Sequence, residues 1–210
     1  VATLVQAAVI GCLLILLPLS RIKRTWTGGT RFGAYFLALG LAFLFVEIAF
    51  IQKFTLFLSH PLYAVAVVLA SFLVFAGTGS AYSLRVAERA AARGLRPVSI
   101  AVAGIVGIAA IYLLILPPLF GRLIGLADGA RILISVALIA PLAFFMGMPF
   151  PLGLRRVAEQ APDFVPWAWG INGFASVVSA VLATLFDIHF GFTVVIVSAL
   201  IIYVVAAALK

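Results

Sequence analysis

The chain has 210 residues, of which 66% are hydrophobic and only 10% are charged. An ordinary soluble domain carries about 25% charged residues, so this composition excludes that class and indicates a membrane protein. The net charge of +8 does not indicate a nucleic-acid partner, because the Lys and Arg residues lie in short connectors between apolar runs and not on one solvated face.

Apolar runs define the predicted elements, since a transmembrane helix needs about 20 consecutive, mostly apolar residues. Seven segments qualify, at residues 2–20, 33–58, 62–83, 98–118, 131–152, 165–187 and 192–209. The sequence therefore predicts an all-α fold, a polytopic transmembrane helix bundle of about seven spanning helices that forms a single domain over residues 1–210. A short turn around His189–Gly191 is expected to make the last two helices antiparallel neighbours.

The distribution of basic residues predicts the orientation in the membrane. One side holds eleven of the 14 Lys and Arg residues, and the other side holds Lys53, Arg122 and Arg131. The richer side is expected to be cytoplasmic, with the N-terminus outside and the C-terminus inside, as in a multi-pass protein of a bacterial cytoplasmic membrane. The basic segment 84–98 is expected to lie near anionic lipid headgroups. Trp26 is one of three tryptophans predicted at this interface.

Glu47 is the polar residue whose place in an apolar helix most needs an explanation. A charged side chain at the bilayer centre costs a few kcal/mol or more, so such residues usually face a bundle interior or a cavity. Gln52 and Lys53 lie five and six positions further on, so neither shares the helix face of Glu47. Glu47 is therefore expected to bond to another helix, which would fix packing, or to have a proton- or cation-linked role. Lys53 is expected to extend to the outer interface.

The segment 140–156, APLAFFMGMPFPLGLRR, is predicted to break the fifth helix. Its helix-interrupting residues are Pro141, Gly147, Pro149, Pro151 and Gly153. Interrupted helices are common locations of transporter binding sites. Asn172 lies at a similar depth on the next helix, and its amide is expected either to cap carbonyls freed near Met146–Met148 or to contact a substrate.

A polar group is predicted at the outer surface, and it comprises Ser59, His60, Arg122, Asp128, Arg131, Asp187 and His189. One Asp and two His are an incomplete ligand set, so no metal site is predicted. No nucleophile–base pair or dinucleotide fingerprint is recognisable, so neither catalysis nor a cofactor is expected from this chain. The Gly77–Ser80 run, GTGS, follows no strand and is expected to allow close helix packing.

Three stretches together resemble a known family: FLFVEIAFIQKFTLFLSHPLYAVAVVLASFLVFAGTGS, MGMPFPLGLRRV and PWAWGINGFASVVSAVLA. They are similar to the membrane region of spermidine-synthase-like integral membrane proteins, whose helices are fused to a cytoplasmic Rossmann-type domain similar to polyamine aminopropyltransferases. The likeness covers roughly residues 32–183 and does not include that soluble domain, so no catalytic residue is carried over. The chain begins with Val1 and not Met, which is compatible with a processed or excised piece of a larger protein.

The resemblance implies a non-catalytic membrane module that anchors a synthase-like partner or moves a small cationic solute such as a polyamine. In that case membrane carboxylates such as Glu47 and Asp187 are the natural counter-charges. The alternative is a structural or accessory subunit of a larger membrane complex. The candidate substrate-binding residues are Glu47, Gln52, Pro149, Asn172 and Asp187, and the outer polar positions beside them are Lys53, His60 and His189.

Overall fold

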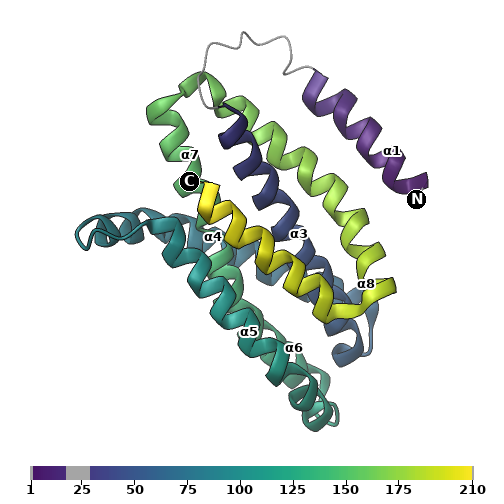
Figure 1. Cartoon of the computed structure of the whole chain (residues 1–210). Coiled ribbons are helices and arrows are strands. Elements are labelled where there is room, and N and C mark those ends of the chain that lie inside the picture. The colour runs from purple at the N-terminus through teal and green to yellow at the C-terminus, as the bar shows by residue number, and fades with distance from the viewer. Residues whose placement is uncertain (1, 18–28, 210) are drawn as a thin grey trace. The chain divides into compact units, whose positions relative to one another are not determined.

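The computed structural model describes residues 2–17 and 29–209, and every element within them is helical (Figure 1). This confirms the predicted all-α class. The elements are α1 (Ala2–Gly11), a π-helical segment (Cys12–Leu16), α3 (Gly29–Leu58), α4 (Pro61–Ala91), α5 (Pro97–Leu123), α6 (Asp128–Met146), α7 (Pro149–Gln160), a 3-10 turn (Pro162–Phe164) and α8 (Val165–Leu209).

Five helical stretches in the described residues are long and apolar enough to cross a membrane, where the sequence predicted seven. They are Gly29–Leu58, Pro61–Ala91, Pro97–Leu123, Asp128–Gln160 and Pro162–Leu209. The predicted first span appears as a shorter apolar helix, Ala2–Ile15, and the rest of that predicted segment lies outside the described residues. The predicted last two spans both fall within α8.

Helix α8 contains one non-helical residue, Gly191, with φ 77° and ψ 170°. This region of backbone space is essentially restricted to glycine. The chain reverses direction there, and the second part of α8 runs back toward the end where the first part began (Figure 1). The turn predicted around His189–Gly191 is therefore confirmed, and Gly191 is the residue at which the helix is interrupted.

The chain divides into two compact units. Residues 1–46 and 150–210 form the first unit, and residues 47–149 form the second. The chain passes from one unit to the other within α3, between Val46 and Glu47, and at the start of α7, between Pro149 and Phe150.

In the first unit, the beginning of α3 packs closely against α8. A Cβ built on Gly40 would lie 2.5 Å from the backbone oxygen of Asn172 and 2.8 Å from the Cβ of Ala175, so only glycine fits at this crossing. Aromatic side chains extend the contact toward α7, since the ring of Phe150 lies 5.3 Å from Phe36 and 4.7 Å from Trp169. Small residues thus bring the two helices together as expected for packing in lipid.

In the second unit, α4 and α6 cross with their backbones in contact. A Cβ added to Gly79 would overlap the carbonyl oxygen of Phe144, and one added to Gly147 would overlap the carbonyl oxygen of Ala76. The expectation that the Gly77–Ser80 run allows close approach is confirmed at Gly79, whereas Gly77 faces open space. Helix α5 packs against α6, where a Cβ on Gly104 would lie 2.5 Å from the Phe145 ring.

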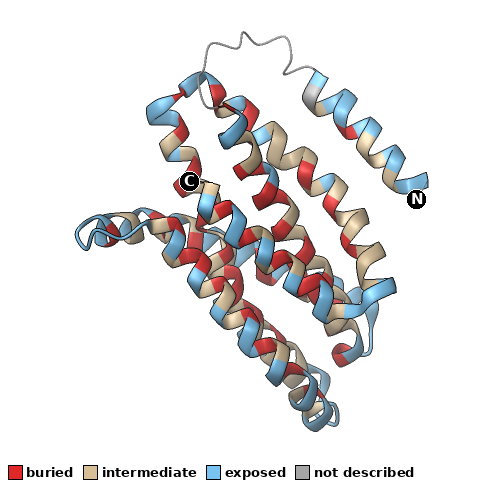
Figure 2. Ribbon diagram, viewed as in Figure 1, coloured by how far each residue is buried: buried red, intermediate tan, exposed pale blue. Residues whose placement is uncertain are grey.

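Large apolar side chains remain exposed on the outer faces of the helices (Figure 2). Leu62, Leu73, Leu114 and Leu133 are among the most exposed, at 72–85% of their accessible area. Exposed leucines on long helices are the surface that lipid covers. Of the basic residues used to predict orientation, Arg21, Lys23, Arg24 and Lys210 lie outside the described residues, as does Trp26.

Candidate functional site

Glu47 lies in the mostly apolar run of α3 between Arg31 and Gln52, about 27 Å along the helix from Gly29 when each residue contributes about 1.5 Å. Its side chain is half-buried. Its carboxyl makes no hydrogen bond or ion pair within residues 2–17 and 29–209. The packing hydrogen bond that was one of the two predicted explanations is therefore not found in the described part of the chain.

The helix face that carries Glu47 continues into a buried aromatic cluster. Phe50 and Phe54 lie three and seven residues after Glu47, so all three share one side of α3. The aromatic cluster consists of Phe50, Phe54, Phe57, Phe72, Tyr112 and Phe120. Apart from the Tyr112 hydroxyl, which donates to the Leu138 carbonyl at 2.6 Å, the side chains of this cluster have no hydrogen-bonding group.

The rings of the cluster are in close contact. Phe57 and Phe120 stack with their centroids 4.3 Å apart, and Phe54 meets Phe120 edge-to-face at 5.0 Å. Phe50 meets Phe72 edge-to-face at 5.8 Å. Sequence reasoning did not single out this cluster, although the spacing of Phe50, Phe54 and Phe57 at helical intervals is the signal that could have revealed it.

Gln52 and Lys53 are both half-buried on the same helix. Gln52, like Glu47, makes no hydrogen bond with any described residue. The structure therefore places two polar side chains of α3, Glu47 and Gln52, in a partly buried environment with unused hydrogen-bonding capacity. Their five-residue separation puts them on different faces, as the sequence predicted.

The predicted break of the fifth helix occurs at Gly147–Met148, between α6 and α7. Pro149 is buried at the first position of α7, where a missing N–H costs little. Pro141 was expected to contribute to the break, but it lies inside α6, which continues through it. Proline is tolerated within membrane helices because neighbouring groups can satisfy the freed backbone.

The break at Gly147 is packed and does not open toward α4. The N–H of Gly147 still donates to the Ala143 carbonyl at 3.0 Å, and the N–H of Met148 donates to the Phe145 carbonyl at 3.2 Å. Because the backbone of Ala76 lies directly against Gly147, no solute fits between α4 and α6 at this level. This geometry favours a packing role for the Gly147 side of the break.

Asn172 bonds to α3. Its Nδ2 donates to the backbone carbonyl of Phe36 at 3.2 Å, and about two turns further along α8 the hydroxyl of Ser179 donates to the carbonyl of Leu41 at 2.7 Å. Capping of a backbone carbonyl was one of the two predicted roles of Asn172, but the carbonyl belongs to α3 and not to the segment Met146–Met148. The amide and the hydroxyl thus bind α8 to the first half of α3.

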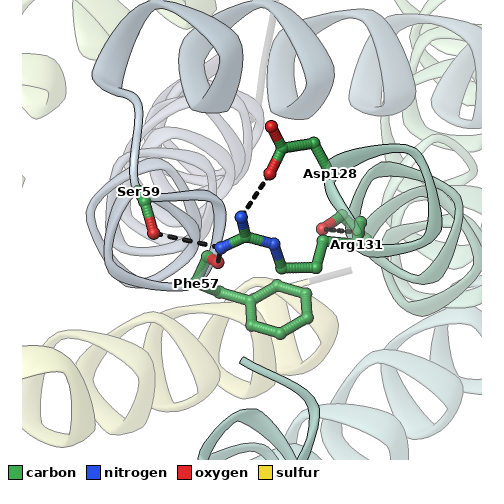
Figure 3. Close-up of polar contacts among 5 residues, drawn as sticks. Phe57, Ser59, Asp128 and Arg131 are labelled. Carbon is green, nitrogen blue, oxygen red and sulfur yellow. Dashed lines mark hydrogen bonds and ion pairs between the residues drawn. The ribbon is translucent and has the colours of Figure 1, made fainter. Parts of the chain in front are cut away.

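Part of the predicted outer polar group is assembled around Arg131, which extends from α6 to the α3–α4 connection (Figure 3). Its Nη1 donates to the carbonyl oxygen of Phe57 at 2.9 Å and to the hydroxyl of Ser59 at 3.0 Å, and its Nη2 pairs with Asp128. The Arg131 side chain is only 11% exposed, whereas that of Asp128 is 62% exposed. We call these four residues the Arg131 clamp.

The Arg131 clamp stabilises an unusual turn. Ser59 has a φ of 62°, which is the left-handed region that residues other than glycine seldom adopt. A cation beside the carbonyls at the end of α3 also interacts favourably with the helix dipole. The clamp therefore has the geometry of a structural connection between α6 and the turn that joins α3 to α4.

The remaining outer residues are more exposed. His60 is the N-cap of α4 without a side-chain capping bond, and its ring meets Tyr63 edge-to-face at 5.5 Å. His189 is exposed, with its Nδ1 2.8 Å from the carbonyl oxygen of Leu185. Asp187 is half-buried two residues earlier in α8. The described residues contain no group of three or more His, Cys, Asp or Glu that could hold a metal ion.

Long apolar helices with a few half-buried polar side chains are the features of a multi-pass α-helical membrane protein. Comparisons of the chain with protein-family models, with curated proteins and with solved structures found no match. The resemblance to the membrane region of spermidine-synthase-like proteins therefore rests on the three sequence stretches alone.

Proposed function

We propose that the chain is a non-catalytic membrane module that moves a small cationic solute, with Glu47 as the counter-charge in the membrane. The observation that carries this proposal is the half-buried Glu47 carboxyl, which has no hydrogen-bond or ion-pair partner among the described residues. A carboxylate in an apolar helix is costly, and a mobile cation or a proton offsets that cost when no side chain does.

The surroundings of Glu47 favour a cation or proton over a fixed partner. The aromatic cluster on the same helix face contains no anionic group, and its one hydroxyl, that of Tyr112, donates to the backbone carbonyl of Leu138. Aromatic faces, however, attract cations, with interactions worth about 0.5–2 kcal/mol. A polyamine, which combines amine charges with short methylene segments, has the chemistry to contact both.

The proposed membrane arrangement has seven spans, with the N-terminus outside and the C-terminus in the cytoplasm. Arg31, near the start of α3, donates a hydrogen bond to the backbone of Leu209, at the end of α8, so these two positions lie at the same end. An even number of crossings must then separate them. Four candidate spans lie between residue 29 and the start of α8, and α8 adds two more when it is counted as two helices joined at Gly191. The number of crossings between Arg31 and Leu209 is then six, which is even. A first span that includes residues 2–17 completes the seven.

The resemblance suggests where such a module acts. We propose a bacterial cytoplasmic membrane and a synthase-like soluble partner, which the module anchors while it moves the substrate or product of that partner. In this arrangement the basic loops would face the compartment that contains the partner.

Carbodiimide labelling tests the proposed role of Glu47. Dicyclohexylcarbodiimide is an apolar reagent that adds to a protonated carboxyl group and forms an acylisourea, which rearranges to a stable acylurea. In membranes that contain the full chain, we expect labelling of Glu47, detected by peptide mass spectrometry, and protection from labelling by added spermidine. Potassium chloride at the same ionic strength controls for charge screening. Unlabelled Glu47, or labelling that saturating spermidine leaves unchanged, would contradict the proposal.

A further inference from the structure

Helix α4 is longer than a membrane requires. Its 31 residues extend about 46 Å at about 1.5 Å each, whereas the hydrocarbon core is about 30 Å thick. If Pro61 marks one edge of that core, about 20 residues cross it, and the helix leaves it near Tyr82. The last ten residues of α4 would then extend from the edge of the core through the lipid headgroups and just beyond them.

This final part of α4 carries an ordered basic face. Tyr82, Arg85 and Arg89 are spaced at intervals of three and four residues, which puts them on one side of the helix. The guanidinium carbons of Arg85 and Arg89 lie 5.5 Å and 5.7 Å from the centroid of the Tyr82 ring. Arg89 Nη1 also donates to the Tyr82 hydroxyl at 2.5 Å. One aromatic ring thus orients two guanidinium groups.

Two more arginines follow in the connection to α5. Gly94 has a φ of 65°, and the N–H of Leu95 donates to the Ala90 carbonyl at 2.9 Å, so the helix ends in a tight glycine turn. Arg93 precedes this glycine, and Arg96 is the N-cap of α5. We call Arg85, Arg89, Arg93 and Arg96 the arginine patch. All four residues are exposed, Arg85 and Arg89 within α4 and Arg93 and Arg96 in the connection that follows it. Figure 2 shows this connection between α4 and α5 mostly in pale blue.

The charge of the arginine patch is not neutralised within the described residues. Glu88 is the one acidic residue in the segment 84–98, and it forms no ion pair with any arginine that the structure describes. Arg155, in contrast, pairs with Glu159 at 3.0 Å. Four exposed guanidinium groups at this end of α4 are therefore available to an external anion.

We propose that the arginine patch binds the phosphate groups of anionic lipids, with Arg85 and Arg89 held by Tyr82 as its ordered centre. Guanidinium groups suit phosphate because they donate two parallel hydrogen bonds. The position of the patch at the end of a span favours a lipid over a soluble anion or an acidic protein, and aromatic residues such as Tyr82 are enriched at this interface. The proposal requires only that α4 crosses the bilayer, and it is independent of the role of Glu47.

Native mass spectrometry of the full chain in mild detergent tests this proposal, with phosphatidylglycerol and phosphatidylcholine as probes. We expect the chain to retain phosphatidylglycerol in preference to phosphatidylcholine. Each basic residue near an anionic surface contributes roughly a fivefold gain in affinity, so the double variant Arg85→Gln/Arg89→Gln is expected to bind phosphatidylglycerol at least tenfold more weakly. The matched Arg85→Lys/Arg89→Lys variant keeps the charge and should lose less, and Arg122→Gln, on the opposite side of the membrane in the predicted orientation, should lose nothing.

Three results would overturn the proposal. The first is equal retention of the two lipids by the unmodified chain. The second is unchanged phosphatidylglycerol binding by the double glutamine variant, whose helical content is checked by circular dichroism. The third is full displacement of the lipid by millimolar inorganic phosphate, which would indicate a site for a soluble anion.

Discussion

Arg131 joins three parts of the second unit through one guanidinium group: the end of α3, the turn that follows it, and the first turn of α6. Its side chain is almost fully buried although it carries a permanent charge. The bonds to the Phe57 carbonyl and the Ser59 hydroxyl compensate for part of the lost hydration, since a hydrogen bond to a charged group contributes about 1.5–3 kcal/mol. The residue therefore has a structural reason to be present that does not depend on any ligand.

Replacing Arg131 by Gln should destabilise the protein. We expect a loss of about 2–3 kcal/mol in the free energy of unfolding, because the Phe57 carbonyl and Ser59 hydroxyl lose a charged donor. Unfolding in mixed micelles, followed by circular dichroism, measures the change. Arg122→Gln is the matched control, since Arg122 is exposed, and it should change stability by less than about 0.5 kcal/mol. Equal stability of the two variants would show that the Arg131 clamp contributes nothing.

Several of these residues were predictable from sequence, but their partners were not. Ser59, Asp128 and Arg131 were predicted together at the outer surface because each lies at the end of an apolar run. Ser59 and Arg131 are 72 residues apart in the sequence, and no sequence pattern predicts their hydrogen bond, because it depends on how the helices pack. Capping a carbonyl was likewise one of the two roles expected of Asn172, but the accepting residue, Phe36, was not predictable without the α3–α8 contact.

At the scale of the helix pair, the crossing of α4 and α6 depends on two glycines that face backbone atoms. Gly79 lies against the Phe144 carbonyl, and Gly147 lies against the Ala76 carbonyl. Contact between backbones maximises van der Waals packing, which is a main source of helix association when lipid removes the hydrophobic driving force. The two glycines therefore stabilise the second unit because they allow the backbones of α4 and α6 to touch.

Gly79→Ala should disrupt this crossing. The added methyl group overlaps a carbonyl that belongs to a helix backbone and cannot move alone, so we expect a loss of about 1–3 kcal/mol in stability. Gly77→Ala, two residues away, is the matched control because its methyl group meets no atom within 4 Å. That variant should be neutral or more stable by up to about 1 kcal/mol, since alanine is the better helix former. Thermal unfolding of both variants in the same detergent separates the effects, and an unimpaired Gly79→Ala protein would contradict the packing argument.

The prolines show which helix breaks could be predicted from local sequence and which could not. The break at Gly147–Pro149 was correctly predicted, because a glycine and a proline at the junction both weaken helical structure. The same rule overstated the effect of Pro141, and helix α5 also continues through Pro117 and Pro118. Local sequence shows which backbone bond a proline removes, but whether the helix continues depends on the surrounding packing.

At the scale of the whole molecule, the length of the apolar runs was sufficient to predict an all-helical chain with several helices long and apolar enough to cross a membrane, because the bilayer sets that length. Span boundaries were less accurate, since helices can be longer than the roughly 20 residues that cross the hydrocarbon core, as α4 is with its 31 residues. The division into two compact units had no counterpart in the sequence, because it depends on which helices contact one another. The expectation of a polyamine-linked module stays a prediction.

Flux through the reconstituted full chain tests the central claim most directly. We expect proteoliposomes that contain the unmodified protein to accumulate radiolabelled spermidine, and Glu47→Gln, which removes the charge and keeps the side-chain shape, to reduce the initial rate at least tenfold while the protein still inserts. Glu88→Gln makes the same substitution at an exposed position of α4 and should leave the rate unchanged. Spermidine uptake by the Glu47→Gln protein at the rate of the unmodified protein would contradict the account.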